Sequence, residues 1–337
     1  MISATIGWVL PEGVRSMAKP ESLDRTPKGI ALVTRNWRIL FAALASILLG
    51  GFSIFAFPTD SRTDEYKAGE TFKDCPDCPE MLVIPAGEFT MGSPSSETGR
   101  FENEGPQHRV TIGYLLAVGK YEVTVAEFAQ FATDTGYVAN SGCYYWTGSR
   151  WALGVHYSWW SPPGFDQTSS EPVVCVTWND AKAYVDWLSK RTRKSYCLLS
   201  EAEWEYASRG GVTSPRPWGA GLSHEDANYG TDECCQTYSQ DRDQWRFTAP
   251  VGSFAPNRFG LYDMMGNVWE WVDDCWNENY VDAPIDGSSW QSGDCLKRVI
   301  RGGSWYSESR RVRSAVRYAF GKGVNRTKVG FRVGRDL

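Results

Sequence analysis

The longest apolar segment of the chain lies near its N-terminus. Residues 39–57 are uncharged and mostly apolar, and their number approaches the ~20 residues with which a helix spans the hydrocarbon core of a membrane. Six Lys and Arg residues precede this segment, so the positive-inside rule predicts a cytoplasmic basic tail over 1–38 and places the chain from residue 60 onward outside. We therefore expect a single-pass protein of the bacterial inner membrane whose folded domain faces the periplasm.

A cleaved signal peptide is the alternative interpretation of residues 39–57. The segment before it is long for a signal peptide, the apolar run exceeds the usual hydrophobic region, and no good A-x-A cleavage site follows. These features favour an uncleaved transmembrane helix.

Beyond the apolar segment, the pattern predicts a short linker followed by one domain. Residues 58–74 are polar and charged without periodicity, which is typical of a linker, and the domain is expected over 75–337. Short apolar runs and alternating positions predict strands, which are expected at 81–84, 88–91, 109–112, 298–301 and 329–333.

Three helices are predicted by capping residues and by apolar positions at three- and four-residue steps. Capping boxes, in which Ser or Thr precedes Glu by three positions, open the first and third helices, and glycines follow both. Helical spacing of apolar residues marks the second. The helices are expected at 125–134, 177–190 and 200–210.

Composition adds that the domain is rich in loops and packed around large aromatic side chains. The chain has 33 Gly, 17 Pro and 16 Trp, so long helices should be few. Beyond residue 38 there are 29 basic and 37 acidic residues, a net charge of −8. This balance provides no broad attraction for nucleic acid or anionic lipid, because both require a basic field.

The nine cysteines fit an oxidising compartment, where disulfides persist. Cys75 and Cys78 have redox-type spacing, but the surrounding pattern favours a local structural disulfide. Cys275 and Cys295 bracket a polar loop and are expected to pair. The adjacent pair at 234 and 235 cannot readily bond to each other without backbone distortion, so their partners are sought elsewhere. The candidates are Cys143, Cys175 and Cys197.

Several separated motifs occur in the order known from one family. They are PEMLVIPAGEFTMGS at 79–93, VGKYEVT at 118–124, PVVCVTW at 172–178, LSEAEWEYA at 199–207, PVG at 250–252, NRFGLYDMMGNVWEW at 257–271, RGGSW at 301–305 and GFR at 330–332. Over about 79–334 the chain thus resembles the sulfatase-modifying factor, or formylglycine-generating enzyme, family. The resemblance implies an α+β, C-type-lectin-like fold with little regular secondary structure, to which the sequence adds the N-terminal transmembrane helix.

The resemblance also identifies what the chain lacks. In the oxidases of this family two cysteines after the Gly-Gly-Ser motif bind copper, and soft thiolates suit Cu(I). Here Ser307 and Ser309 stand at those positions, while the active-site serine is retained as Ser304 and the Asn before Gly-Phe-Arg is replaced by Lys328. We therefore expect that the chain does not bind copper. We also expect that it does not oxidise cysteine by the route known for the family.

The calcium-binding positions of the family match this sequence better than its copper positions do. The resemblance therefore implies that the chain binds structural calcium. Carboxylate and carbonyl oxygens within a tight loop suit this cation. One set consists of Asp263, Glu270 and the carbonyl groups of Gly266 and Val268, and the other consists of Asn228, Asp243 and the carbonyl groups of Tyr229 and Trp245. The histidines, His108, His156 and His224, are scattered without metal-ligand spacing and are expected to be turn or packing residues.

The C-terminal segment carries the strongest local charge. Residues 297–335 contain twelve Lys and Arg residues and only one acid, a net charge of +11. Arginines on the family motifs are expected to form buried pairs with acids such as Glu270 or Asp273; they are Arg301, Arg313, Arg317 and Arg332. Basic residues outside the motifs alternate with aromatic ones, which predicts a shallow surface for an anionic ligand or partner. The residues expected to bind it are Tyr306, Arg310, Arg311, Tyr318 and Lys328.

Two classes of function follow from these observations. The first is a ligand-binding or accessory module, of which the retroelement-diversified ligand-binding proteins with this fold are a special form. The second is an oxidoreductase or maturation enzyme with different metal chemistry, since other members of the superfamily use iron or assist siderophore maturation. The missing cysteine pair favours the first class.

Overall fold

A computed structural model describes residues 66–139, 142–231 and 242–337. The predicted tail at 1–38 and the predicted transmembrane helix at 39–57 lie outside these residues. Of the helices in the described part, none combines the length and the apolar character that crossing a membrane requires.

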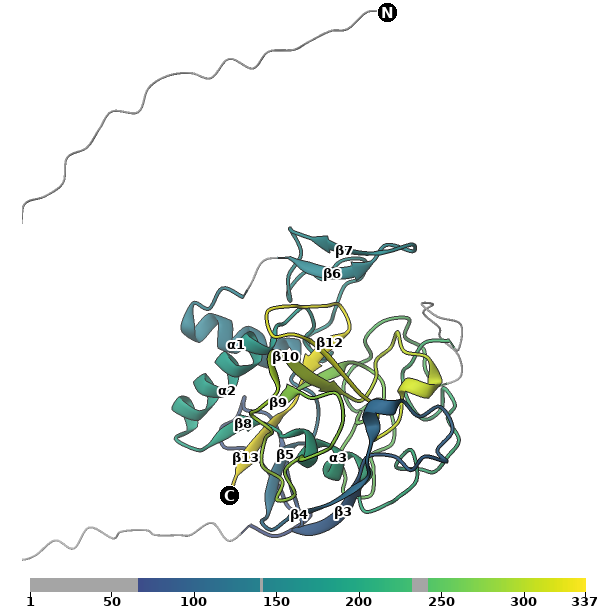
Figure 1. Ribbon diagram of the computed structural model, residues 1–337. Coiled ribbons are helices and arrows are strands. Elements are labelled where there is room, and N and C mark those ends of the chain that lie inside the picture. The colour runs from purple at the N-terminus through teal and green to yellow at the C-terminus, as the bar shows by residue number, and fades with distance from the viewer. Residues whose placement is uncertain (1–65, 140–141, 232–241) are drawn as a thin grey trace, which may run out of the picture. The chain divides into compact units, whose positions relative to one another are not determined.

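Three α-helices begin and end as their capping residues predict. They are α1 (Val125–Thr135), α2 (Trp178–Thr192) and α3 (Glu201–Arg209). Thr124, Thr177 and Ser200 each accept a hydrogen bond from the backbone three residues ahead, which satisfies an amide that the helix leaves unpaired. The three predicted helices are confirmed. Figure 1 shows α1 and α2 side by side on one flank of the domain.

The first sheet has five antiparallel strands in the order β1-β2-β5-β13-β8. The strands are β1 (Thr71–Phe72), β2 (Met81–Ile84), β5 (Leu116–Gly119), β13 (Val333–Asp336) and β8 (Tyr196–Leu198). Strand β1 lies within 58–74, so the interpretation of that whole range as linker is wrong. The fold begins before Cys75 because Phe72 pairs with Met81 and packs on the core.

The second sheet has four strands in the order β11-β10-β9-β12. They are β11 (Arg317–Gly321), β10 (Asp294–Arg301), β9 (Trp269–Trp276) and β12 (Val329–Phe331). Strand β12 runs parallel to β9, while the other pairs are antiparallel. The single strand predicted over 329–333 is thus two strands in two sheets, separated by Arg332, whose side chain is buried against Glu270.

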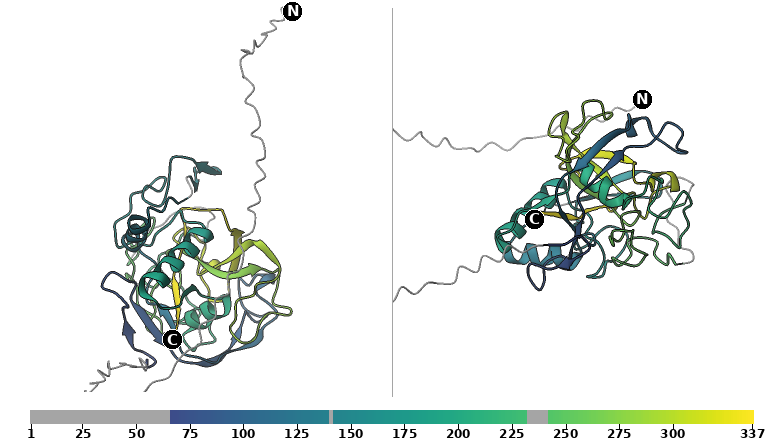
Figure 2. Two further views of the ribbon diagram at one scale, coloured as in Figure 1. Left: turned by 90° about the vertical axis from the view of Figure 1, so that its left-hand side faces the viewer. Right: turned by 90° about the horizontal axis from the view of Figure 1, so that it is seen from below.

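Two hairpins complete the fold. One joins β3 (Gly87–Met91) to β4 (His108–Ile112), and the other joins β6 (Cys143–Trp146) to β7 (Trp151–Gly154). Short 3₁₀ helices occur at η1 (Glu102–Glu104) and η2 (Ser309–Arg311). Figures 1 and 2 show the two hairpins at different ends of the domain.

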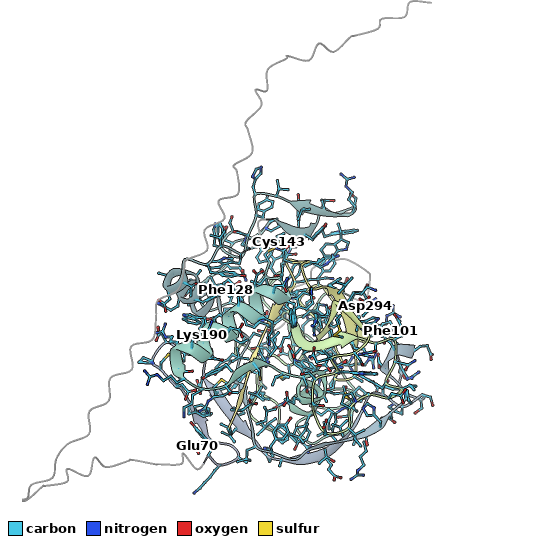
Figure 3. All side chains as sticks on the ribbon, turned by 60° about the vertical axis from the view of Figure 1, so that its left-hand side comes forward. Glu70, Phe101, Phe128, Cys143, Lys190 and Asp294 are labelled. Carbon is cyan, nitrogen blue, oxygen red and sulfur yellow. A yellow bond between two sulfur atoms is a disulfide. The ribbon has the colours of Figure 1, made fainter. Side chains whose placement is uncertain are left out.

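Hydrophobic side chains gather in three clusters. The first joins α1 and α2 to the first sheet and contains Phe128, Tyr184 and Phe331. The second surrounds the fully buried Trp204 of α3. A smaller third cluster lies under the β6–β7 hairpin and contains Trp305 and Tyr306. Figure 3 shows how densely side chains fill the domain, with Cys143 near the base of the hairpin.

Buried arginines hold the clusters to one another. Arg301 binds Glu201 and Glu205, at 2.5 and 2.6 Å, and Arg317 binds Glu201 at 2.7 Å. Arg313 pairs with Glu104, and Arg332 with Glu270. The predicted buried pairing is confirmed for all four. The suggested partner Asp273 is wrong, because it pairs with the partly exposed Lys182.

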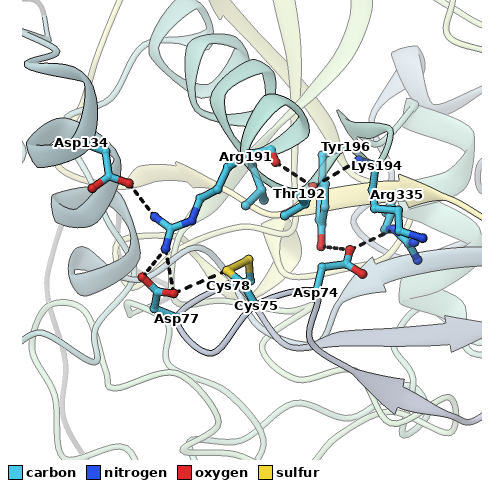
Figure 4. The surroundings of a disulfide bond; sticks show 11 residues. Asp74, Cys75, Asp77, Cys78, Asp134, Arg191, Thr192, Lys194, Tyr196 and Arg335 are labelled. Atoms are coloured by element: carbon cyan, nitrogen blue, oxygen red, sulfur yellow. Dashed lines mark hydrogen bonds and ion pairs between the residues drawn. A yellow bond between two sulfur atoms is a disulfide. The ribbon is translucent and has the colours of Figure 1, made fainter.

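Three disulfides lie in the described residues, and two of them are the predicted ones. Cys75 pairs with Cys78 and Cys275 pairs with Cys295. In Figure 4 the first lies beside Asp77, whose carboxylate is held by Arg191, so this CxxC is part of a structural ion-pair network.

The third disulfide corrects a prediction. Cys143 pairs with Cys175, and Cys197 is a free thiol, so none of the three is joined to 234 or 235. The adjacent pair itself lies outside the described residues.

Candidate functional site

A pocket of about 300 Å³ opens between the β6–β7 hairpin, the second sheet and the segment around η2. Its volume is at the lower end of the range for small-molecule sites, about 300–1,000 Å³. The lining is aromatic and cationic: Trp151, Trp269, Tyr306, Ser307, Glu308, Arg311, Tyr318, Phe320, Arg326 and Lys328. The pocket therefore offers ring faces and positive charge to one ligand.

The basic residues of the pocket wall are held by backbone contacts on both sides. The Cys175 amide donates to the Arg326 carbonyl, and the Thr327 amide donates to the Tyr144 carbonyl. The Cys143–Cys175 disulfide joins these two flanks. Lys328 immediately precedes β12, where its carbonyl accepts from the Trp269 amide at 2.9 Å. The segment is thus fixed between the hairpin and the second sheet.

The cations of the pocket are poorly neutralised. Arg311 donates to Glu308 at 2.9 Å. Arg326 instead stacks on Phe320 and Trp151, with its guanidinium carbon 4.3 and 4.8 Å from the ring centroids. Neither Arg326 nor Lys328 has a carboxylate partner among the described residues. The pocket consequently carries an excess of positive charge.

Lys328 lies between aromatic rings. Its Nζ atom is 4.8 Å from the Trp151 centroid and 4.9 Å from the Tyr306 centroid. Burial lowers the pKa of this ammonium group to about 7, and the charges of Arg326 and Arg311 act in the same direction. Near neutral pH the amine is therefore present in both charge states.

Two buried polar atoms at the pocket lack a hydrogen-bond partner within residues 66–139, 142–231 and 242–337. One is the hydroxyl of Tyr306, a residue that is 7% exposed, and the other is Nε of Arg326. Buried polar groups are usually satisfied, because leaving one unpaired costs about 1–3 kcal/mol. Both atoms therefore have unused hydrogen-bonding capacity at the pocket wall.

Of the five residues that the sequence predicted to bind a ligand, four line the pocket, namely Tyr306, Arg311, Tyr318 and Lys328. Arg310 does not line it. Its side chain is half exposed, stacks on Phe101 and pairs with Glu308.

Two tryptophans of the pocket wall were missed. Trp151 belongs to a hairpin that the sequence did not predict, and Trp269 was not among the residues expected to bind the ligand. The aromatic run at 144–146 before Gly148 and Trp151 after it were the available signal for the hairpin.

Ser307 and Ser309, which the resemblance aligned with the family's cysteines, both make contacts in this region. Ser307 is buried, lines the pocket, and lies 3.2 Å from Ser304, oxygen to oxygen, while also accepting from the Ser304 amide. Ser309 begins η2, where its carbonyl accepts from Arg216. Hydroxyl groups at these positions offer hard oxygen donors in place of the thiolates that Cu(I) prefers.

A second groove of about 610 Å³ adjoins the pocket through Tyr306, which lines both. Its walls include Trp146, Trp305 and the stacked pair Phe165 and Phe247, whose ring centroids are 4.5 Å apart. The aromatic surface therefore extends past the pocket along the outer side of Tyr306.

The first predicted calcium set is largely engaged in protein contacts. Glu270 accepts two hydrogen bonds from Arg332, and Trp204 also donates to it. Asp263 accepts from the Gly252 amide at 2.6 Å, and burial raises its pKa to about 6. Gly266 and Val268 lie in the tight turn between these carboxylates. With Arg332 at Glu270, this set has little unpaired charge to offer a cation.

The second predicted set retains one buried oxygen that is unpaired among the described residues, although the Asp243 carboxylate accepts hydrogen bonds from the Tyr229 and Trp245 amides. The side-chain oxygen of Asn228 is buried without a hydrogen-bond partner, and burial raises the pKa of Asp243 to about 6. His224 contacts Asp243 at 3.0 Å, so this histidine is more than the packing residue expected. The described residues hold no cluster of three His, Cys, Asp or Glu side chains, so carbonyl oxygens of Tyr229 and Trp245 would complete this site.

Comparison with known proteins agrees with this architecture. The model of the sulfatase-modifying factor enzyme 1-like domain matches residues 67–337. A formylglycine-generating enzyme of Thermomonospora curvata is 32% identical over 76% of this chain and 93% of its own length. A bovine (Bos taurus) inactive C-alpha-formylglycine-generating enzyme 2 is 31% identical over 67% of this chain and 76% of its own. The structure of PvdO from Pseudomonas aeruginosa matches with a TM-score of 0.71 and 41% identity, covering 81% of this chain and all of that one.

Proposed function

Because the chain belongs to the sulfatase-modifying factor family of formylglycine-generating enzymes and their relatives, we propose that it is a ligand-binding or accessory member of that family. Its ligand is a small anion with an aromatic group, bound in the pocket around Tyr306. The protein binds this ligand and does not carry out copper-dependent oxidation of cysteine. An anchored domain facing the periplasm is part of the same proposal.

The unneutralised charge of the pocket carries this proposal. Arg326 and Lys328 stand among ring faces without a carboxylate partner in the described part of the chain, and Arg311 contributes a third cation. An anion with a planar group would receive hydrogen bonds from the guanidinium groups and stack on Trp151 or Tyr306. The unpaired Tyr306 hydroxyl adds a donor for the same ligand.

The serines at the family's cysteine positions support a role other than copper chemistry. Ser307 contributes a hydroxyl group to the pocket wall and is hydrogen bonded to Ser304. Calcium is proposed as a structural ion at the Asn228 and Asp243 set, where it would supply the positive charge that the buried oxygens lack.

Calorimetric titration with matched probes tests the anion requirement. We expect 2-naphthoate to bind about tenfold or more tightly than the uncharged 2-naphthamide, because only the carboxylate pairs with guanidinium. Arg326→Glu should weaken naphthoate binding about tenfold or more, whereas Arg310→Glu, a matched change outside the pocket, should alter it less than about threefold. Equal affinity for both probes in the native protein would contradict the proposal.

Elemental analysis of the purified protein separates the two classes of function. Stoichiometric copper or iron would favour an oxidoreductase or maturation enzyme over a binding module. If calcium is the only metal found and the protein binds naphthoate, the result supports the proposal of a binding module.

A further inference from the structure

The position of Lys328 gives its amine an environment different from that of a surface lysine. The Nζ atom lies within 5 Å of the centroids of Trp151 and Tyr306, and no oxygen of the described residues forms a hydrogen bond or ion pair with it. Its backbone is fixed by Trp269 and its side chain is partly buried, so the amine lies at the pocket wall among these rings.

The charges around this amine act mainly against its protonation. The titratable and charged groups that line the pocket with Lys328 are Arg311, Arg326, Glu308, Tyr306 and Tyr318. Glu308 is the only acid, and it already pairs with Arg310 and Arg311. A lysine amine becomes nucleophilic at neutral pH when it is desolvated or placed beside another cation, and Lys328 meets both conditions.

We propose that Lys328 is a nucleophile that forms an imine with the carbonyl group of an aromatic aldehyde or ketone bearing an anionic group. The proposal rests on the proposed function, since the same pocket cations bind the anion. The aromatic walls take the ring, and Arg311 and Arg326 take the carboxylate or phosphate. The ligand class is thereby narrowed from any aromatic anion to one with a reactive carbonyl.

The chemical step balances without an oxidant or reductant. The lone pair of the neutral amine attacks the carbonyl carbon, a C–N bond forms, and the electrons of the C=O π bond move to oxygen. Transfer of a proton from nitrogen to oxygen gives the carbinolamine. Loss of the hydroxyl group with a second proton from nitrogen then releases one water molecule and leaves the C=N bond.

Pyridoxal 5′-phosphate is a suitable probe, because it is an aromatic aldehyde with a phosphate group. The protein is incubated with it, reduced with borohydride and digested, and the modified lysines are mapped by mass spectrometry. We expect modification at Lys328 with an apparent midpoint near pH 7, well before the reference Lys322 on the loop after β11. In Arg326→Gln, which removes a neighbouring cation, the midpoint should move to higher pH.

A second measurement separates failure of this inference from failure of the proposed function. Pyridoxine 5′-phosphate keeps the ring and the phosphate but has an alcohol in place of the aldehyde, so it reports binding without imine formation. If it binds the pocket while Lys328 reacts no faster than Lys322, the nucleophile is refuted and the anion site stands. If it does not bind and no adduct forms at Lys328, both are refuted. In Lys328→Arg, which keeps the charge but removes the primary amine, the reduced adduct at position 328 should be lost while Lys322 is modified at the rate seen in the native protein.

Discussion

Glu201 is the carboxylate on which the buried arginines most depend. Its two oxygens accept from Arg301 at 2.5 Å and from Arg317 at 2.8 and 2.7 Å, and the hydroxyl group of Tyr280 also donates to it. Glu201→Gln keeps the volume of the side chain but removes its charge. The amide nitrogen of Gln would then face a guanidinium donor.

The expected loss follows from what the substitution leaves behind. Arg301 retains Glu205, but Arg317 pairs with no other carboxylate of the described residues, and both guanidinium groups are fully buried. Removing one partner of a buried ion pair costs about 3–5 kcal/mol, because the other charge remains without compensation. For a domain of this size that corresponds to a melting temperature lower by roughly 2–4 °C for each kcal/mol.

Urea unfolding and a thermal melt of the two proteins measure this loss. The matched control is Glu88→Gln, which breaks the exposed Glu88–Arg109 pair on the β3–β4 hairpin and should leave the melting temperature nearly unchanged. A folded Glu201→Gln variant as stable as the control variant would refute the claim that buried charge pairing holds these clusters together.

Four further outcomes are expected. Burial, reinforced by the charge of Glu201, raises the pKa of Asp274 from 3.8 to about 7. The favourable contribution of this group to stability is therefore complete below about pH 4 and is lost as pH rises toward 7. In urea unfolding over that interval, Asp274→Asn should remove a pH dependence on the order of 4 kcal/mol. Calcium at a hundred times its dissociation constant should raise the unfolding free energy by about 2.7 kcal/mol, and Asp243→Asn should abolish the response to chelator in a thermal melt. Replacing both Cys143 and Cys175 by Ser should cost about 3–4 kcal/mol for a separation of 32 residues, and titration calorimetry should show weaker naphthoate binding because Trp151 loses its anchor. A periplasmic reporter fused after Asp60 should be active only outside the cytoplasmic membrane, and a soluble mature chain starting near residue 58 would contradict the anchor.

Local rules predicted the helices well. Thr124, Thr177 and Ser200 decide where the helices begin, because each side chain satisfies an amide of the first turn regardless of the rest of the fold. The buried role of Arg301 and Arg332 was likewise predicted, since those residues lie on family motifs. The acidic partners of these arginines could not be predicted from spacing, because a partner such as Glu201 lies about a hundred residues from Arg301 along the chain.

The candidate site was only partly predictable for the same reason. Basic and aromatic residues near the C-terminus are close in sequence, so their gathering was expected. The wall formed by Trp151 belongs to the β6–β7 hairpin. This hairpin forms a β-bridge with Arg326, which is distant in sequence, and a disulfide joins it to Cys175. Charge alone also misplaced Arg310, which pairs with Glu308 and stacks on Phe101 without lining the pocket, although Arg311 makes both of these contacts and does line it.

The pocket rests on the smallest of the three hydrophobic clusters, the one that contains Trp305 and Tyr306. Opening a small peripheral unit costs less free energy than unfolding the whole domain. Amide protons of the β6–β7 hairpin should therefore exchange with solvent earlier than those of β5 or β9. A chain kept in a reducing compartment would lose the covalent link beneath this hairpin and could keep its main body folded while its binding surface loosens. Readiness to bind would then depend on the compartment in which the chain matured.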